Sequence, residues 1–456
     1  MLPAAAFILS LAYWIYLLWN TKMVIGGDAQ GYELLGAHIR DGWGPFFATG
    51  PQREPLYPLV ISWSMHLGKA LQAPYTLIQG GVQIFILGLS QFLLYRVLKR
   101  LQVRPWFSAL AMLYFGFSPA VVNSGFSLYS EILTYPFMLG IILFSARAWE
   151  KLDRHSRRQA MIAGVCFGLL FTGITLVKAI FEFIFLMFVL AFIGLSLWGM
   201  FKGQKQKAAN AVFFLLAAAM TFEIPITAYK FINQSSNGQF TITDRGSWAL
   251  YGNTARRMQP MDGQRLAAAV AYIPGEGFCR RFRSERQCWE WSSGPSDALG
   301  LGANGAVSSA PKSERNHMLT AMTIQEILKN PAQYGLLAGL ETMKLFFWES
   351  TRVGYVIYPP WLARIYDLEL FKNCLRLTIF AVTLAAFLGC LLFWIKGKRP
   401  VMLGWTLFSI AAYAMMHAPF FILTRYAFPV VPAFLICIAY FFEQIHRRER
   451  PRPRCA

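Results

Sequence analysis

The chain has 456 residues, of which 56% are hydrophobic, 16% are aromatic and only 14% are charged. Soluble domains carry about 25% charged residues, so this composition excludes an ordinary soluble, fibrous or disordered protein. Lys and Arg number 43 against 23 Asp and Glu. In a soluble protein such an excess would suggest binding of nucleic acid. The basic residues lie in short connectors rather than on one face with interleaved aromatic residues, which argues against that partner. Membrane lipids are the predicted surroundings.

Apolar runs close to the ~20 residues that a helix needs to cross a bilayer predict about ten transmembrane helices. They lie at roughly 3–20, 74–95, 105–124, 129–147, 159–176, 179–200, 208–229, 374–395, 401–421 and 427–443. The first run lacks a positive n-region and a cleavage site, so we expect a retained span. The predicted fold class is an all-α polytopic membrane protein. Its parts are an N-terminal transmembrane module (1–229), an outer loop region (230–373), and C-terminal helices with a basic tail (374–456).

Short basic clusters predict the orientation of these helices. The clusters lie at 96–104, 147–158, 202–207, 396–399 and 447–454, all on one side of the predicted membrane. By the positive-inside rule this side is cytoplasmic, which places both termini inside a plasma (inner) membrane. The segments 21–73 and 230–373 then lie outside. The Arg residues of the second segment do not contradict this, because long loops translocate regardless of charge.

The first outer loop, 21–73, predicts two amphipathic helices that lie along the membrane surface. Asp28 precedes a helical pattern that Gly42 ends, so one interpretation of Asp28 is a helix N-cap and nothing more. The second pattern follows a run of prolines. Its apolar positions are Leu59, Val60, Trp63, Met65 and Leu67.

The long outer loop, 230–373, carries weaker signals. Residues 240–253 and the Gly- and Ser-rich stretch 292–314 predict irregular structure, and the second is a lid candidate. Residues 324–349 return to helical periodicity and predict a peripheral or re-entrant helix. Cys279 and Cys288 predict a disulfide in an oxidising compartment, with two free thiols as the alternative.

Ionisable residues next to apolar spans are candidate functional residues, because charge in a membrane is costly. Those that map to the outer face are Arg53, Glu54, Glu131, Lys178, Glu182 and Arg425. Each has a structural alternative. Lys178 and Arg425 can snorkel to headgroups, and Glu131 can favour a helix start. Arg53 and Glu54 can pair locally, as Lys178 and Glu182 can.

Together with Asp28, these groups place cations and carboxylates in one interfacial zone. Such a zone suits a lipid-linked anion, such as an isoprenoid phosphate, beside a possible base. The few His residues lack the spacing of metal ligands. No metal and no cofactor is therefore expected.

Four short segments carry a resemblance to a known family. They are GGDAQGYELLGAHI after the first span, REPLYPLVI before the second surface helix, SEILTYPF at the fourth span and TRYAFPVVPAFLI at the last. They resemble motifs of the polyprenyl-phosphate-sugar-dependent glycosyltransferases with the C-type membrane fold, the group of protein O-mannosyltransferases and the lipid A aminoarabinose transferase. The resemblance implies that fold, and transfer of a sugar from a polyprenyl-phosphate donor to a hydroxyl acceptor at the outer face. Protein, lipid and polysaccharide acceptors stay open.

The resemblance also implies roles for individual residues. Asp28 matches the catalytic carboxylate, a general base whose action inverts the anomeric centre. Arg425, beside Tyr426, and Lys178 match positions that hold the carrier phosphate. Glu131 would orient the sugar or the acceptor. Arg53, next to Glu54, would contact the site or brace Asp28.

The chain departs from the family pattern at two points. Ala29 follows Asp28 where many relatives have Glu, and Lys178 stands where Arg is common, which keeps the charge and loses the bidentate fork. Since no D-x-D follows the first span, a metal bound there is not expected. A transporter or flippase of lipid-linked saccharides is the alternative function, although no internal repeat supports it. A non-catalytic assembly subunit is a third hypothesis.

Overall fold

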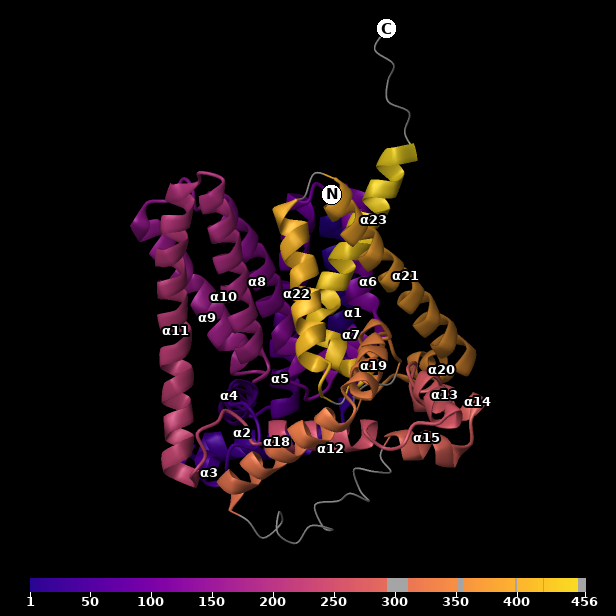
Figure 1. Ribbon diagram of the computed structural model, residues 1–456. Helices are drawn as coiled ribbons and strands as arrows, with labels where there is room; N and C mark the ends of the chain where they lie inside the picture. The colour runs from indigo at the N-terminus through magenta and orange to yellow at the C-terminus, as the bar shows by residue number, and fades with distance from the viewer. Residues whose placement is uncertain (293–310, 352–355, 398–399, 421, 450–456) are drawn as a thin grey trace.

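The computed structural model describes residues 1–292, 311–351, 356–397, 400–420 and 422–449. Of these residues 81% are helical, and the strands among them are two short segments, β1 (Lys22–Met23) and β2 (Val356–Ile357), that pair antiparallel. Figure 1 shows long helices packed side by side, with both termini at one end of the bundle and shorter helices across the other end. Most of the predicted lid at 292–314 lies outside the described residues.

Eight helical segments of the described chain are long and apolar enough to cross a membrane. They are α1 (Leu2–Asn20), α5 (Tyr75–Arg100), α8 (Glu131–Lys151), α9 (Arg157–Thr175), α10 (Phe181–Phe201), α11 (Lys205–Asn237), α21 (Glu369–Lys396) and the final segment Thr424–Arg448. This final segment comprises η2 (Thr424–Val430) and most of α23 (Val431–Glu449). The all-α, multi-pass class predicted from the sequence is confirmed.

The two remaining predicted spans have a different form. Helices α6 (Pro105–Phe117) and α7 (Pro119–Phe126) form a pair bent by 49°, and α22 (Val401–His417) is a shorter apolar helix of 17 residues. Pro119 cannot donate a backbone hydrogen bond, and Ser118 starts the new helix by accepting one from the N–H of Val121. The total of ten spans stays a prediction.

Outward-facing apolar side chains support a lipid environment for the long helices. On α10, Leu186, Leu190 and Leu197 are each more than half exposed, as expected for a helix whose outer face meets lipid. Between helices the packing is close. A Cβ added to Gly164 or Gly168 of α9 would lie 2.2 Å or 2.6 Å from a backbone carbonyl of α11. Glycine is required there for the two backbones to approach.

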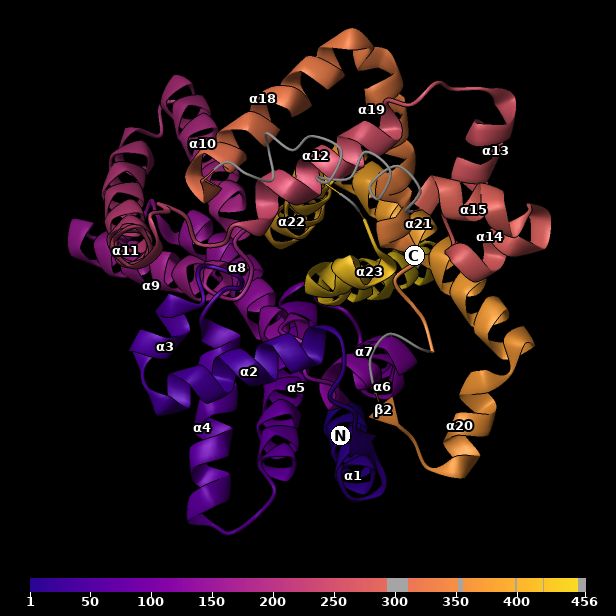
Figure 2. The same ribbon diagram turned by 90° about the horizontal axis from the view of Figure 1, so that it is seen from below.

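Three helices of the segment 21–73 lie at the end of the bundle away from the termini (Figures 1 and 2). They are α2 (Asp28–Asp41), α3 (Trp43–Ala48) and α4 (Leu56–Ala70). The face of α4 that packs inward contains Tyr57 and Ile61, and Ile61 fits against Gly36 of α2. Trp63 and Leu67 are 61% and 50% exposed, as expected for a helix that lies on a membrane surface.

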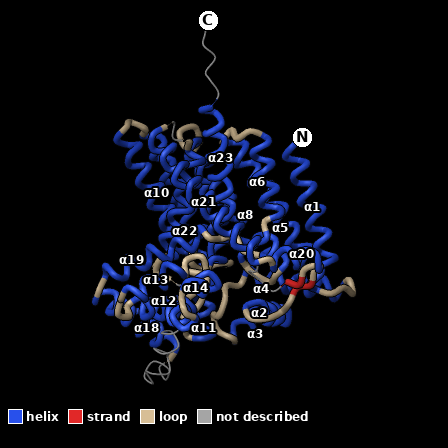
Figure 3. Tube along the Cα trace, turned by 90° about the vertical axis from the view of Figure 1, so that its right-hand side faces the viewer, coloured by secondary structure: helices blue, strands red, loops and turns tan. Residues whose placement is uncertain are grey.

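The segment 230–373, predicted as an outer loop region, contributes short helices beside and below the bundle (Figure 3). They are α12 (Arg245–Arg257), α13 (Gly263–Ala271), α14 (Glu276–Phe282), α15 (Glu285–Ser292), α18 (Lys312–Lys329), α19 (Pro331–Thr342), η1 (Met343–Phe346) and α20 (Pro360–Asp367). The prediction of irregular structure over 240–253 is wrong from Arg245 onward. Although Gly246 and Gly252 disfavour a helix, packing of α12 on α18 and the buried ion pairs of α12 override that propensity.

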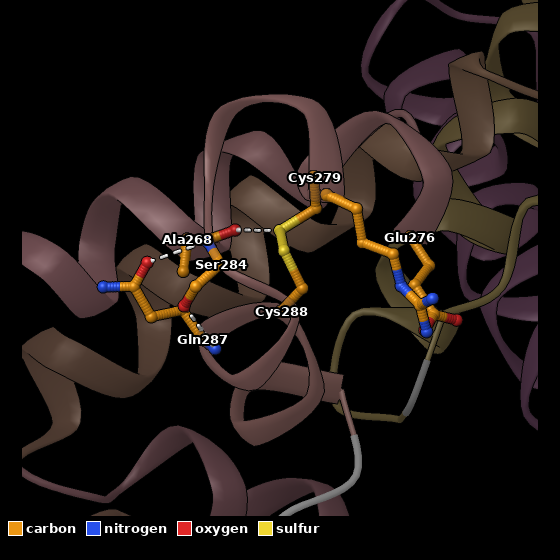
Figure 4. The surroundings of a disulfide bond; sticks show 7 residues. Ala268, Glu276, Cys279, Ser284, Gln287 and Cys288 are labelled. Carbon is orange, nitrogen blue, oxygen red and sulfur yellow. Dashed lines mark hydrogen bonds and ion pairs between the residues drawn. A yellow bond between two sulfur atoms is a disulfide. The ribbon is translucent and has the colours of Figure 1, made fainter.

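The stretch predicted as one helix over 324–349 is broken. Asn330 ends α18, and its side chain then caps α19 by accepting a hydrogen bond from the N–H of Gln333. Cys279 and Cys288 form a disulfide between α14 and α15 (Figure 4), and both are fully buried. This bond ties together two short helices that have little core of their own.

A buried carboxylate stabilises the bend between α6 and α7. Glu349 accepts hydrogen bonds from the Tyr114 hydroxyl (2.5 Å), the Ser118 hydroxyl (2.7 Å) and the Ala120 N–H (2.8 Å). Burial raises the pKa of the Glu349 carboxyl, and these hydrogen bonds oppose that shift. The carboxylate therefore supplies the acceptor that the start of α7 requires.

Replacing Glu349 with alanine leaves these buried donors unpaired, so we expect the free energy of unfolding to fall by about 3 kcal/mol. Glu349→Gln keeps one acceptor and is expected to cost less. The measurement is the unfolding temperature of the purified protein in detergent. An alanine variant as stable as the wild type would show that Glu349 does not hold the bend.

Candidate functional site

A cavity of about 1110 Å³ is lined by residues of elements that meet at the end of the bundle away from the termini. Its walls come from α2, from the segment before α4, from the starts of α8 and α10, from α12, and from η2. The seven predicted site residues all line it: Asp28, Arg53, Glu54, Glu131, Lys178, Arg425 and Tyr426. Residues from distant parts of the sequence therefore meet in one cavity.

Asp28 lies between two arginines at the start of α2. Gly27 precedes it with φ of 53°, a left-handed conformation that glycine accommodates. The interpretation of Asp28 as the N-cap is wrong, because Gly27 is the capping residue and Asp28 is the first residue of the helix. Oδ1 of Asp28 accepts a hydrogen bond from Nη2 of Arg53 (2.6 Å), and Oδ2 accepts one from Nη2 of Arg425 (2.5 Å).

The two arginines control the charge of Asp28. Burial would raise the pKa of the Asp28 carboxyl, but the positive charges of Arg425 and Arg53 and the hydrogen bonds they donate lower this pKa to about 2. The carboxylate is therefore ionised at neutral pH. It is also weakly basic for as long as both arginines hold it.

Arg425 is mostly buried against aromatic rings and retains hydrogen-bonding capacity. Its guanidinium lies 5.1 Å from the centre of the Tyr129 ring and 5.7 Å from that of Tyr426. The backbone carbonyl of Tyr426 accepts a hydrogen bond from the Tyr413 hydroxyl (2.5 Å), which fixes η2 against α22. Nε of Arg425 is buried and makes no hydrogen bond to the described residues. An arginine has five N–H donors, so Arg425 has the capacity to bind an anion beside Asp28.

Glu131 and Lys178 form a second ion pair in the cavity wall, with 3.0 Å between Oε1 and Nζ. Burial lowers the pKa of Lys178, but the Glu131 charge outweighs this and raises it above the ordinary value. Glu131 is only 4% exposed, and its Oε2 accepts no hydrogen bond from residues in the described ranges. This oxygen is an unused acceptor at the cavity wall.

Two of the local pairings considered from the sequence are wrong. Arg53 pairs with Asp28, whereas Glu54 accepts a hydrogen bond from the N–H of Ala179 (2.8 Å). Glu182 pairs with Lys230 of α11 (2.5 Å), because Lys178 turns to Glu131. Lys230, just beyond the predicted span 208–229, was missed as a lining residue. A signal for Lys230 was available in the sequence, because Glu182 lies beside an apolar run and a carboxylate there requires a cationic partner.

Helix α12 anchors the connector that leads to Arg425. Arg257 of α12 donates hydrogen bonds to the carbonyls of Ala418 (2.7 Å), Pro419 (3.3 Å) and Phe420 (3.2 Å), and another to Glu341 (2.9 Å). These contacts hold the end of α22 against α12 and α19. Sequence reasoning missed them, because nothing in the pattern of 240–253 indicated a helix.

The anchor belongs to a buried charged cluster formed by Arg256, Arg257, Glu341 and Lys344. Burial raises the pKa of Glu341, but the three surrounding cations outweigh it and lower that pKa. Burial and the neighbouring arginines lower the pKa of Lys344 to about 8, against the opposing effect of Glu341.

In the part of the chain that the structure describes, no three His, Cys, Asp or Glu side chains gather closely enough to hold a metal ion. Comparisons with family models, with curated proteins and with solved structures found no match to this chain. The four resembling segments and the geometry of the cavity are therefore the basis for a functional proposal.

Proposed function

We propose that this protein is an integral-membrane glycosyltransferase of the C-type membrane fold. It transfers a sugar from a polyprenyl-phosphate donor to a hydroxyl acceptor of an envelope lipid, glycan or protein. The observation that carries the proposal is Asp28 held between Arg53 and Arg425 in a large cavity, where Arg425 keeps an unused donor. A candidate base and a cation suited to a phosphate thus line the same cavity, and transfer from a phosphate leaving group uses both.

In the proposed reaction, the acceptor hydroxyl attacks the anomeric carbon and gives its proton to Asp28. The bond between the anomeric carbon and the phosphate oxygen breaks, and its electron pair leaves with the polyprenyl phosphate. Arg425 and Lys178 stabilise the charge that develops on this leaving group. Attack opposite the leaving group inverts the anomeric configuration. Glu131 orients a hydroxyl through its unused oxygen, and Arg53 braces Asp28.

Orientation in the membrane forms part of the proposal. The elements that line the cavity lie at the end of the bundle away from both termini, and the positive-inside rule applied to the basic clusters favours a cytoplasmic side for those termini. The reaction then takes place at the outer face of the plasma membrane, where a lipid-linked donor supplies an activated sugar.

The pKa of Asp28 predicts a distinctive pH dependence. Proton uptake removes the base, so the rate falls as the pH falls through this pKa, which is about 2 in the free protein. A donor phosphate that shares Arg425 weakens its hold on Asp28 and raises that pKa. Since kcat/KM reports the free enzyme and kcat the complex, we expect the acid limb of kcat to lie at higher pH than that of kcat/KM. Coincident limbs would contradict the shared-arginine mechanism.

Mass spectrometry of the cell envelope tests the proposed function directly. Lipids, glycans and proteins are compared between cells that express the wild type and Asp28→Asn at matched levels. A sugar-sized mass that is present only with the wild type establishes transfer and identifies the sugar class and the acceptor. Identical profiles would overturn the proposal. Movement of a labelled lipid-linked sugar between leaflets of vesicles that contain the protein would then support a transporter.

A further inference from the structure

Gln239 is a buried residue that lines the cavity and has no role in the proposed reaction. It follows Gly238, which ends α11 with φ of 76°, and it is only 4% exposed. It lines the same cavity as Asp28. Neither Nε2 nor Oε1 of its amide makes a hydrogen bond to any residue in the described ranges.

The segment that carries Gln239 is well anchored, so its unpaired amide is not the result of a loose chain. The carbonyl of Gln239 accepts a hydrogen bond from the N–H of Thr241 (3.0 Å), and the carbonyl of Thr241 accepts one from the Asn233 side chain (2.7 Å). The N–H of Asp244 donates to the carbonyl of Pro51 (2.9 Å), two residues before Arg53. The segment is therefore fixed both to α11 and to the loop that braces Asp28.

An unpaired buried amide destabilises the folded protein, since each unmet polar group costs free energy. Native proteins pair most such groups. A residue that lines a cavity and has both a donor and an acceptor unused is suited to a ligand that offers both.

The chemistry of the amide narrows the class of ligand. A phosphate oxygen would satisfy Nε2 but leave Oε1 unpaired, and an apolar chain would satisfy neither. Two neighbouring hydroxyls satisfy both, because each hydroxyl donates and accepts. A carbohydrate carries such pairs. Nearby, Glu182 and Lys230 form an ion pair in the same wall, and Lys230 lies 5.8 Å from the ring of Phe240, the residue after Gln239.

We infer that Gln239 is a carbohydrate-binding residue whose amide donates to one hydroxyl of a sugar and accepts from the next. The inference rests on the proposed function for the source of that sugar, which is either the sugar of the donor or a saccharide acceptor. In both cases Gln239 determines specificity for the ligand and takes no part in proton transfer.

The test uses Gln239→Met in the full chain, purified into lipid nanodiscs. Methionine keeps the length of the side chain and removes both hydrogen-bonding groups. Because an unpaired amide destabilises the empty protein, we expect the variant to unfold at the same or a higher temperature than the wild type. A merely structural role for Gln239 predicts a lower unfolding temperature instead.

Asn237→Leu is the matched control. Asn237 lies two residues away, and its side-chain amide also makes no hydrogen bond to the described residues, but it is not among the residues that line the cavity. Its replacement is expected to leave every binding constant unchanged.

Affinities are measured for three probes: a short-chain polyprenyl phosphate, the same lipid carrying glucose, mannose or galactose, and the free methyl glycosides. If the donor supplies the sugar, Gln239→Met loses tenfold or more in affinity for the glycosylated lipid and none for the bare lipid phosphate. If the acceptor supplies it, the variant keeps both lipid affinities and loses affinity for a methyl glycoside.

Three outcomes would overturn the inference: wild-type affinities for all probes in Gln239→Met, equal losses in Asn237→Leu, or no binding of any sugar probe by the wild type. One further result would count against the proposed function alone. In that case the wild type binds methyl glycosides through Gln239 but binds neither the bare nor the glycosylated polyprenyl phosphate.

Discussion

Asp28→Asn is expected to lower the rate of sugar transfer by about 10²–10⁴-fold, the range that general acid–base catalysis contributes. Asparagine has nearly the same shape and retains one oxygen that can accept from Arg53 or Arg425. It cannot take the proton of the acceptor hydroxyl. The loss therefore appears in kcat, with a smaller effect on binding of the donor, since the arginines that hold its phosphate remain. Single-turnover transfer of a labelled sugar in vesicles measures it.

Asp41→Asn on the same helix is the control for this substitution. Asp41 is exposed, pairs with its neighbour Arg40 and is not among the residues that line the cavity. Its replacement should leave the transfer rate within twofold of the wild type. Transfer by Asp28→Asn at more than a tenth of the wild-type rate would contradict its role as the base, and equal losses in both variants would indicate damage to α2.

The membrane helices were predictable because a long run of apolar residues is visible in the local sequence. The run 183–201 contains no charged residue, and no tertiary contact is needed to recognise it. The bend at Pro119 and the helix over Arg245–Arg257 depend on distant partners instead. Glu349 stabilises the first and the ion pairs to Glu341 the second. Local sequence reasoning therefore gave a single span at 105–124 and irregular structure at 240–253.

The gathering of the charged candidates at one end of the bundle was predictable, whereas their pairings were not. Each charged candidate stood beside an apolar run at one membrane face, which the sequence itself reveals. Asp28 and Arg425 are 397 positions apart, and no spacing rule joins them. The local rule wrongly paired Arg53 with Glu54 and Lys178 with Glu182. Gln239 gave no signal, because an uncharged amide in an outer loop is unremarkable until its burial and missing partners are known.

Arg425→Ala is expected to lower the transfer rate by about 10²–10³-fold, as the loss of a group that stabilises developing negative charge does. Arg425→Lys should fall between this variant and the wild type, because lysine keeps the charge and loses the planar fork. Arg364, exposed on α20 and not among the cavity-lining residues, provides the control. Arg364→Ala is expected to transfer at the wild-type rate. Full activity of Arg425→Ala would exclude it as the phosphate ligand.

Arg425→Ala also separates the two roles of this guanidinium. Removing its charge leaves Arg53 alone to lower the pKa of Asp28, so that pKa rises in the free protein. The acid limb of kcat/KM should then move to higher pH and approach that of kcat. Donor binding can no longer raise the pKa of Asp28 by drawing Arg425 away from it. Asp28→Asn combined with Arg425→Ala should be far from additive, since both changes break one ion pair. Additive losses would show that Asp28 and Arg425 act independently.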